Sequence, residues 1–477
     1  MRRLHLLLFV WIFLGCCVGA YAQDPGPWFQ VLSGSQLPNV TYPGVVTHQG
    51  NTGTGWETTV VDLGDGNSGL RMTNPGSGWS CWSMWPEGTN PAPGDPPQNT
   101  LAARFRIDSV GNGVRMDLLH VKPHSHGRKN VPIAIGIKDG HLWFLQYACG
   151  TVPTDRFFVD LGPVEIGKWN IVYLITISPP IGPPDEPVAI CYWNGAKVFD
   201  HNFKYELDTL PTYSASECAF GVGIEGGNGP AVVTFDWIAD NFYVIDPPAV
   251  STLNDAKVYP DGTSVQLEHL VVTNRLYDDM LGYFSFNAQS YDRASGIRVV
   301  SSALVGLGDD ITIQGGLATI DGERVIVAGL TEDSVIVNSQ GDVPKPIAVT
   351  NRSSAGAAFG AQLAVVDDAL SNPPVMSNGA NNVGLFVTIF GRVTAVESTG
   401  LYEGFFYIDD GTGLRDGSGY AGIKCRPAAR YCNPCDMPAV GSYVAVTGAM
   451  GVRQIEGKNV RYFWTWNWEE LESPLAR

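Results

Sequence analysis

The sequence predicts an all-β chain in which a two-sheet sandwich is followed by two small barrels, and three observations support this. Charged residues make up only 16% of the 477 residues, whereas Gly (56) and Pro (32) are plentiful. This composition favours many short strands joined by tight turns over long amphipathic helices. Apolar residues rarely recur at helical spacing, and many windows show the two-residue alternation of a half-buried strand instead.

Residues 1–22 have the organisation of an export signal. A basic start precedes an apolar run over residues 4–20, and the segment ends in Ala-Tyr-Ala. This pattern predicts cleavage before Gln23 and a secreted, extracellular product. The alternative is a lipoprotein signal through the Leu-Gly-Cys-Cys of residues 14–17, whose preceding residues suit such cleavage poorly. No later stretch reaches the ~18 apolar residues of a membrane helix, so no membrane insertion is expected after signal removal.

The net charge of -17 disfavours nucleic acid as a partner. Binding a phosphate backbone relies on Lys and Arg side chains that displace counterions. Aromatic residues that are candidates for base stacking lie on predicted barrel strands, at Tyr283, Phe284, Phe405 and Tyr407. Alternation sends at least half of them into barrel cores, so we expect no nucleic acid partner.

Residues 28–246 predict one β unit. Gly, Pro, Asn and Asp separate apolar or alternating runs at Trp56–Leu63, Leu101–Ile107, Gly113–Val121, Val131–Ile137, His141–Ala148, Trp169–Ile177, Val188–Trp193 and Val232–Ile245. The number and spacing of these runs are typical of a sandwich of two sheets.

Three local patterns in this unit occur in an order that matches a known family. They are the strand around Trp169, the hairpin with Asn194-Gly195 at its turn, and the segment 226–238. Together they resemble the concanavalin A-like and laminin G-like, lectin-type sandwich domains. The resemblance implies a jelly-roll sandwich over residues 23–247, with Trp169 in its core.

Residues 261–326 and 383–463 are interpreted as diverged copies of one motif. Four landmarks match in the same order: 265–273 with 386–394, 282–286 with 404–408, 292–299 with 416–424, and 308–315 with 441–448. Four matches in one order indicate an internal repeat.

Each copy has the strand pattern of a small OB-fold barrel. The copies resemble the OB-like repeats of secreted proteins of environmental bacteria, which implies OB-like domains at 252–350 and 351–477. Residues 351–382 are expected to connect the two, with one short helix over Ala355–Leu370.

A cluster of tryptophans is the strongest binding feature. Trp79, Trp82 and Trp85 lie close together before a Pro-rich loop. Indole faces pack well on the apolar faces of sugar rings, so these residues are the candidate ligand-binding residues for a glycan. The alternative is that they fill the sandwich core, which is the usual fate of large aromatic side chains.

A second tryptophan series ends the chain. Trp464, Trp466 and Trp468 alternate, which predicts three indoles on one face of the last strand. Such a stripe is either an exposed platform or the seal of a barrel or of a seam between domains, and the seal is favoured.

Two groups of residues are weak metal candidates. The imidazoles of His120, His124 and His126 suit Zn or Cu, but no nearby carboxylate or Cys completes a ligand set, so a solvated hairpin tip is favoured. The lectin-like resemblance implies calcium at a loop rim, for which Asp62, Asp65 and Asn67, or Asp236 and Asp240, are candidates. The same residues are ordinary in turns, so no cofactor is predicted and calcium is left open.

Seven of the nine cysteines follow the signal segment. In an exported protein they are candidates for disulfides, at Cys81, Cys149, Cys191, Cys218, Cys425, Cys432 and Cys435. The last three are one ligand short of a structural zinc site, so one disulfide plus a free thiol is favoured there.

No catalytic residues are predicted. The chain lacks the paired-carboxylate strand of sandwich glycosidases, a nucleophile elbow and a His-Glu-x-x-His motif. We therefore expect a secreted, non-catalytic protein that binds a glycan or cell-surface polysaccharide. A sandwich-type polysaccharide lyase or glycoside hydrolase is the first alternative, and a structural protein of an extracellular matrix is the second.

Overall fold

The structure is a computed structural model of the chain. It describes residues 30–32, 36–37, 46–50, 57–64, 66–84, 98–122, 133–146, 156–177, 188–202, 217–241, 247, 249–278, 283–398, 404–427 and 437–471. Within those ranges the structure contains no helix with the length and apolar character of a membrane span. The predicted export signal, residues 1–22, lies outside the described residues.

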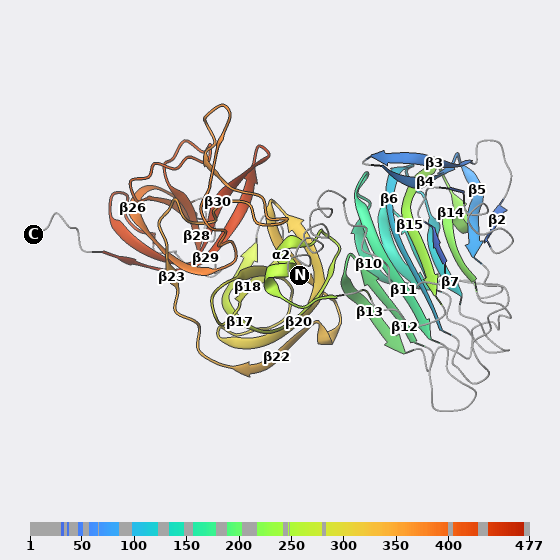
Figure 1. Ribbon diagram of the computed structural model, residues 1–477, viewed down its shortest axis with the longest axis horizontal. Helices are drawn as coiled ribbons and strands as arrows, with labels where there is room; N and C mark the ends of the chain where they lie inside the picture. The colour runs from blue at the N-terminus through green and yellow to red at the C-terminus, as the bar shows by residue number, and fades with distance from the viewer. Residues whose placement is uncertain are drawn as a thin grey trace, which may run out of the picture. The chain divides into compact units, whose positions relative to one another are not determined.

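The chain divides into two compact units, residues 1–189 with 201–246, and residues 190–200 with 247–477. The sandwich sheets occur first along the chain, and the two barrels follow them (Figure 1).

The described residues of the sandwich form two sheets. The eight-stranded sheet contains β1 (Gln30–Leu32), β3 (Glu57–Gly64), β4 (Asn67–Asn74), β6 (Gln98–Val110), β11 (Trp169–Ile177), β12 (Val188–Trp193), β13 (Ala196–Asn202) and β15 (Ala231–Asn241). The seven-stranded sheet runs in the order β10 (Arg156–Pro163), β9 (His141–Gln146), β8 (Ile133–Lys138), β7 (Met116–Lys122), β14 (Glu217–Asn228), β5 (Ser77–Met84), β2 (Val46–Gly50). This is the jelly-roll-like sandwich that the sequence predicts.

Phenylalanine rings mark the sandwich core. Phe220 of β14 packs edge-on against Phe235 of β15, at 5.3 Å between ring centroids, and Phe235 also contacts Phe105 of β6. Because Phe220 and Phe235 belong to different sheets, the faces that carry them point toward each other. Side chains alternate along a strand, so a residue next to a core-facing residue faces the outer side of the sheet.

Two sequence expectations about the sandwich have different outcomes. The Asn194-Gly195 turn is confirmed, because both residues have the positive φ angles (47° and 85°) of a tight hairpin. The expectation that Trp169 lies in the core is wrong. Trp169 is half-buried on the outer face of the eight-stranded sheet, where the guanidinium groups of Arg104 and Arg106 lie over its ring.

The described residues of each barrel place five strands in one topology. In barrel 1 these are β17 (Ser264–Asp278), β18 (Tyr283–Gln289), β19 (Gly296–Val300), β20 (Asp309–Ile320) and β21 (Glu323–Ala328). In barrel 2 they are β26 (Phe386–Ser398), β27 (Gly404–Asp409), β28 (Ile423–Pro427), β29 (Tyr443–Ile455) and β30 (Lys458–Glu470). In both, the third and fifth strands pair in parallel and the first and fourth close the barrel.

Shorter elements flank the barrels. They are β16 (Ala249–Val250), α2 (Leu253–Val258), η2 (Glu332–Ser334), β22 (Val335–Gln340), β23 (Ile347–Ala348), β24 (Val366–Asp368) and β25 (Val375–Met376). The Thr252 hydroxyl caps α2 by accepting a hydrogen bond from the Asp255 amide.

Strand register supports the internal repeat. The first strand of each barrel has a bulge at the same place, at Thr273 and Thr394. The register corrects the second sequence landmark by two residues, because it makes Phe286 equivalent to Phe406 and therefore Ser285 equivalent to Phe405. A shift of two residues keeps every side chain on the same face, which is why the sequence pattern does not reveal it.

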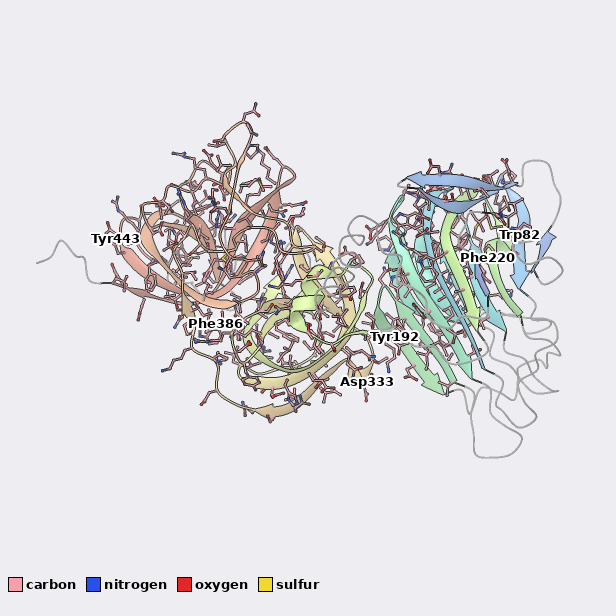
Figure 2. All side chains as sticks on the ribbon, viewed as in Figure 1. Trp82, Tyr192, Phe220, Asp333, Phe386 and Tyr443 are labelled. Carbon is pink, nitrogen blue, oxygen red and sulfur yellow. The ribbon has the colours of Figure 1, made fainter. Side chains whose placement is uncertain are left out.

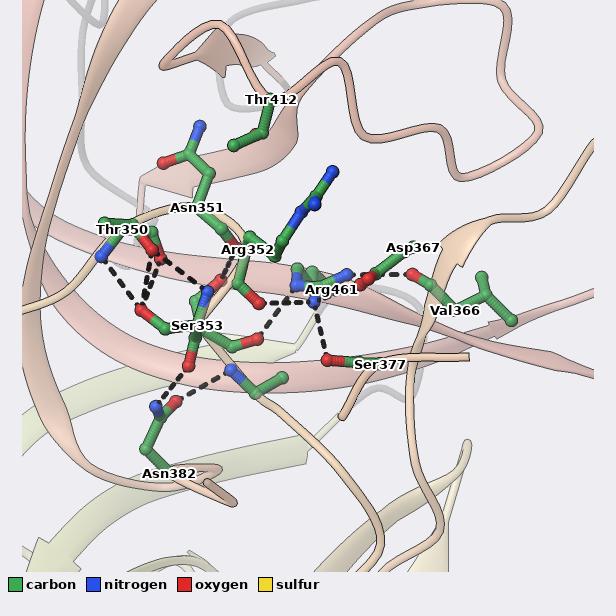
Figure 3. Close-up of polar contacts among 12 residues, drawn as sticks. Thr350, Asn351, Arg352, Ser353, Val366, Asp367, Ser377, Asn382, Thr412 and Arg461 are labelled. Carbon is green, nitrogen blue, oxygen red and sulfur yellow. Dashed lines mark hydrogen bonds and ion pairs between the residues drawn. The ribbon is translucent and has the colours of Figure 1, made fainter. Parts of the chain in front are cut away.

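The connecting segment 351–382 contains no helix, so the predicted helix over Ala355–Leu370 is wrong. Gly356 and Gly360 have positive φ angles (79° and 59°), which interrupt a helix. Buried Arg461 of β30 instead binds this segment through its guanidinium group (Figure 3). It donates to the carbonyl oxygens of Arg352, Ser354 and Val366, to the Asp367 carboxylate and to the Ser377 hydroxyl.

Barrel 2 covers the outer side of β18 and β19 in barrel 1. Asn274, Gln289 and Arg298 on this side are all fully buried. The Asn274 amide donates to the Trp464 carbonyl oxygen at 3.0 Å, and the Phe386 amide donates to the Gln289 side chain at 3.0 Å. The two barrels are therefore joined by specific contacts within one compact unit.

The prediction that three indoles share one face of the last strand is wrong. A bulge leaves Trp466 with no residue opposite it on β29, because Thr465 pairs with Gly448 and Asn467 pairs with the adjacent Thr447. Trp464 is fully buried against Leu276 of barrel 1, and Trp468 packs on the core of barrel 2, whereas Trp466 is 49% exposed. Trp464 therefore seals a seam between barrels, one of the two roles considered for the whole stripe.

Candidate functional site

The candidate site lies on the outer face of the seven-stranded sheet. Leu119 is paired with Phe220 and faces the core, so the next residue, His120, faces outward. His120 pairs with Ala134, which pairs with Leu145, and Leu145 pairs with Phe157. This row crosses four adjacent strands, from β7 to β10.

An aromatic pair stands at the β8–β10 end of this face. The rings of Trp143 and Phe157 meet edge to face, with centroids 5.4 Å apart and planes at 78°. Both side chains are half-buried, and they pack against Ala134 and Leu145. The Trp143 indole N–H donates to the Lys138 carbonyl oxygen at 3.3 Å, which fixes the indole on its strand.

Two cations flank the aromatic pair. The Lys138 ammonium lies 4.1 Å from the centroid of the Phe157 ring, and the Arg115 guanidinium lies 5.6 Å from it. These are cation–π distances. The described residues offer no carboxylate that forms an ion pair with Lys138. Trp143, Phe157, Lys138 and Arg115 together are called the aromatic site below.

An ion pair borders the aromatic site. His141 and Asp160 approach to 2.9 Å, with both side chains 42% exposed. Partial burial acts to raise the pKa of Asp160, but hydrogen bonds from His141 and the Gly162 amide outweigh burial and leave this pKa below its ordinary value. Asp160 therefore stays ionised at neutral pH and is held by His141.

The opposite face of the sandwich provides a comparison. Trp169 lies beneath two cations, and each guanidinium has a carboxylate partner, Arg104 with Asp236 and Arg106 with Asp108, whereas Lys138 of the aromatic site forms no ion pair among the described residues. These ion pairs neutralise the cations, so this face has less attraction for an anionic ligand.

The structure settles one of the three tryptophan candidates. Trp82 is only 5% exposed, lies opposite Phe220 and donates its indole N–H to the Thr58 hydroxyl of the other sheet at 3.3 Å (Figure 2). A buried indole cannot stack on a sugar, so Trp82 belongs to the core, as the alternative interpretation held. The Trp79 side chain and all of Trp85 lie outside the described residues.

The candidate metal ligands do not come together where the structure describes them. His120 is 1% exposed within β7, so its expected place on a solvated hairpin tip is wrong, and His124 and His126 lie outside the described residues. No group of three or more His, Cys, Asp or Glu side chains suited to a metal occurs among the described residues.

The calcium candidates act as structural groups. The Asp62 carboxylate accepts a hydrogen bond from the Gly64 amide, and the Asn67 amide donates to Asp236 at 2.8 Å. Asp236 is 2% exposed and forms an ion pair with Arg104. Asp65 and the Asp240 side chain lie outside the described residues.

Cys191 and Cys425 are free, fully buried thiols, so their disulfide assignment is wrong. Cys191 lies on β12 and Cys425 on β28 with its side chain in the core of barrel 2, and burial raises the pKa of both thiols. The side chains of Cys81, Cys149, Cys218, Cys432 and Cys435 lie outside the described residues.

The aromatic site is not among the sites predicted from the sequence. Its four side chains come from three strands and the loop before β7, and each is unremarkable in its own segment. One signal was present, because the Asp139-Gly140 turn between two alternating runs predicts a hairpin that brings Lys138 and the following strand together. The contribution of Phe157 depends on the pairing of β9 with β10, which no local pattern specifies.

No protein-family model and no curated protein matches the chain. Several solved structures are similar to part of it. An endo-β-1,4-glucuronan lyase from the fungus Trichoderma reesei is 16% identical and has a TM-score of 0.29, over 42% of this chain and 92% of that chain. A carbohydrate esterase from the Shiga toxin-encoding bacteriophage phi24B is 12% identical with a TM-score of 0.30, over 43% and 92%.

An alginate lyase from a Chlorella virus is 12% identical with a TM-score of 0.29, over 39% of this chain and 90% of that chain. At these scores the likenesses carry no conclusion about the activity of this chain. The fold and the site described above define an all-β protein with an aromatic and cationic surface on a sandwich sheet.

Proposed function

We propose that the chain is a secreted, non-catalytic protein that binds an acidic polysaccharide through the aromatic site of its sandwich. The observation that carries the proposal is the position of Lys138 and Arg115 beside the ring of Phe157, on the outer face of a sheet. The half-buried indole of Trp143 completes the surface.

The site combines two kinds of attraction that suit a carboxylated sugar. Aromatic rings pack against the apolar face of a pyranose, and ammonium or guanidinium groups bind its carboxylate. The charge of -17 on the whole chain opposes long polyphosphates, whereas a local pair of cations is enough for one carboxylate per ring.

The proposal is tested with purified protein and a panel of soluble polysaccharides. Affinity electrophoresis should show retardation by polygalacturonate and none by amylose of similar length. Lys138→Gln should raise the dissociation constant for polygalacturonate by about tenfold, the effect of losing one charge-assisted contact. Lys168→Gln removes an exposed lysine beside Trp169 on the other sheet and should leave the constant unchanged.

The same incubations separate the alternatives. Products with new reducing ends or unsaturated sugars would replace the binding-only proposal by a hydrolase or a lyase. Normal folding with no retardation by any polysaccharide would contradict glycan binding and favour a structural protein.

A further inference from the structure

We infer that barrel 2 carries a second saccharide-binding surface, on the outer side of β27 and β28, formed by Phe405, Tyr420, Lys424 and Arg426. The ligand that fits this surface is a sugar ring with one carboxylate. The inference rests on the proposed function for the polymer to which the ring belongs, but the surface itself is argued from barrel 2. These four residues are called the barrel surface below.

The equivalent side of barrel 1 is sealed. The register of the third strands makes Arg298 equivalent to Lys424. Arg298 is fully buried and forms an ion pair with buried Glu323 at 3.2 Å. The first residues of β26 and the β29–β30 hairpin cover this side of barrel 1, so it has no room for a ligand.

Barrel 2 has different chemistry at the same positions. Register places Phe405 where barrel 1 has Ser285, and Tyr407 where barrel 1 has Asn287. Phe405 and Lys424 are both half-buried, and the Lys424 ammonium lies 3.8 Å from the centroid of the Phe405 ring. Barrel 2 therefore has aromatic residues where barrel 1 has Ser285 and Asn287, and its cation Lys424 is half-buried where Arg298 of barrel 1 is fully buried in an ion pair.

Hydrogen bonds fix the aromatic rings. The Tyr407 hydroxyl donates to Asp416 at 2.7 Å, and the Tyr420 hydroxyl donates to Glu397 at 2.5 Å. The Tyr407 ring lies 5.2 Å from Tyr420 and 5.8 Å from Phe405, measured between centroids. Tyr407 is fully buried, whereas Phe405 and Tyr420 are partly exposed, and such rigid rings lose little conformational entropy when a ligand packs on them.

Lys424 is prepared for an anion. Burial lowers the pKa of its ammonium, the Asp416 carboxylate opposes that shift, and Arg426 adds to it. The described residues include no carboxylate in ion-pair contact with Lys424. Partial burial has already removed some of the water around the Lys424 ammonium. A carboxylate that docks beside Lys424 and Arg426 therefore displaces less water and interacts more strongly with the charge.

The surroundings favour a singly charged ring over a phosphate chain. Glu397 and Asp416 border the barrel surface and repel a ligand of higher negative charge. A sugar ring with one carboxylate meets two cations and an aromatic face, which is the complement of the residues present. Single-stranded nucleic acid and a second copy of the chain are the occupants that the experiment must discriminate.

The test uses the full chain with the sandwich site disabled by Trp143→Ala and Lys138→Gln. Calorimetric titration with a galacturonate tetrasaccharide should show one remaining site, and maltotetraose should show none. Lys424→Gln in this background should raise the dissociation constant at least about tenfold, while Lys424→Arg should retain binding. Phe405→Leu should weaken binding, whereas Phe390→Ala, an exposed ring elsewhere on barrel 2, should not.

Each result decides between the two sites. Loss of all binding in the disabled background, or equal binding by Lys424→Gln, would overturn the barrel surface and leave the proposed function intact. Binding that survives the sandwich substitutions undiminished but falls with Lys424→Gln would support the barrel surface and contradict the sandwich proposal. Preferential binding of a single-stranded oligonucleotide, or self-association abolished by Lys424→Gln, would also overturn the inference.

Discussion

Arg324 and Arg461 occupy the same position in the fifth strands of the two barrels, and each binds the segment that leads into its own barrel. The two arginines are equivalent by the antiparallel pairing of the fourth and fifth strands and also by the parallel pairing of the third and fifth strands. Arg324 donates to the carbonyl oxygens of Ala256 and Tyr259 and to Asp261, all before β17. The two barrels therefore share a tertiary contact, in which an arginine of the fifth strand binds the segment that precedes the first strand.

Replacing Arg461 by Lys should destabilise barrel 2 although the charge is kept. A lysine has three donors on one atom, and it cannot reach carbonyl oxygens on separate turns of the connecting segment as the planar guanidinium does. We expect a loss of ~3–5 kcal/mol in the free energy of unfolding, measured by urea titration. Arg392→Lys, at an exposed position on β26, is the matched control, and an equal effect of both changes would contradict this role.

The bulge in β30 predicts different costs for neighbouring tryptophans. Trp464→Ala should lower the free energy of unfolding by ~3–5 kcal/mol, because it empties a fully buried site between the barrels. Trp466→Ala should change it by less than ~1 kcal/mol, because its indole is largely solvated. Thermal or urea unfolding of both variants measures the contrast, and similar losses would contradict the difference in burial between Trp464 and Trp466.

Lys257 should make stability depend on pH. Burial lowers the pKa of its ammonium from 10.5 to about 8, and the Glu323 carboxylate offsets only part of this shift. Its ammonium donates to the carbonyl oxygen of Val383, a core residue of barrel 2, at 2.7 Å, which links α2 to barrel 2. Between the folded and unfolded pKa values, the unfolded chain keeps a proton that the folded protein has released.

The free energy of unfolding should therefore rise with pH above about 8, by at most ~1.4 kcal/mol per pH unit from this residue. Below that pH the folded protein carries the full cost of burying the charged ammonium of Lys257. The measurement is the free energy of unfolding of the parent and of Lys257→Met at pH 7.5, 8.5 and 9.5. As pH rises, the free energy of unfolding of the parent should increase relative to that of Lys257→Met. The free energy of unfolding of Lys345→Met, which changes an exposed lysine, should vary with pH as that of the parent does. A constant difference would contradict a depressed pKa.

Local sequence patterns predict strands well where alternation is regular. The runs Trp169–Ile177 and Val188–Trp193 are β11 and β12 to the residue. The internal repeat is equally accessible, because it is a comparison of the chain with itself. What alternation leaves undetermined is which side of a strand faces the core, since that depends on the partner strands.

The errors follow from that limit. Trp82 and Trp143 both lie on alternating strands, yet one fills the core and the other faces outward. A single bulge separates Trp464 from Trp468, and no residue pattern announces it. The segment 355–370 has a composition that suits a helix, but it is not helical because the Arg461 guanidinium binds the carbonyl oxygens of Ser354 and Val366. Arg461 lies about a hundred residues further along the chain, so no local pattern reveals this contact.

The central claim is that the outer face of the seven-stranded sheet binds an acidic polysaccharide, and one comparison of two indoles tests it most directly. Trp143 and Trp169 lie on opposite faces of the sandwich. Trp143 packs against Phe157, whose ring has Lys138 and Arg115 beside it, whereas the two guanidinium groups over Trp169 form ion pairs with Asp236 and Asp108. Calorimetry with polygalacturonate should show that Trp143→Ala weakens binding about tenfold or more while Trp169→Ala leaves it unchanged. Equal affinities for both variants and the parent would contradict the account.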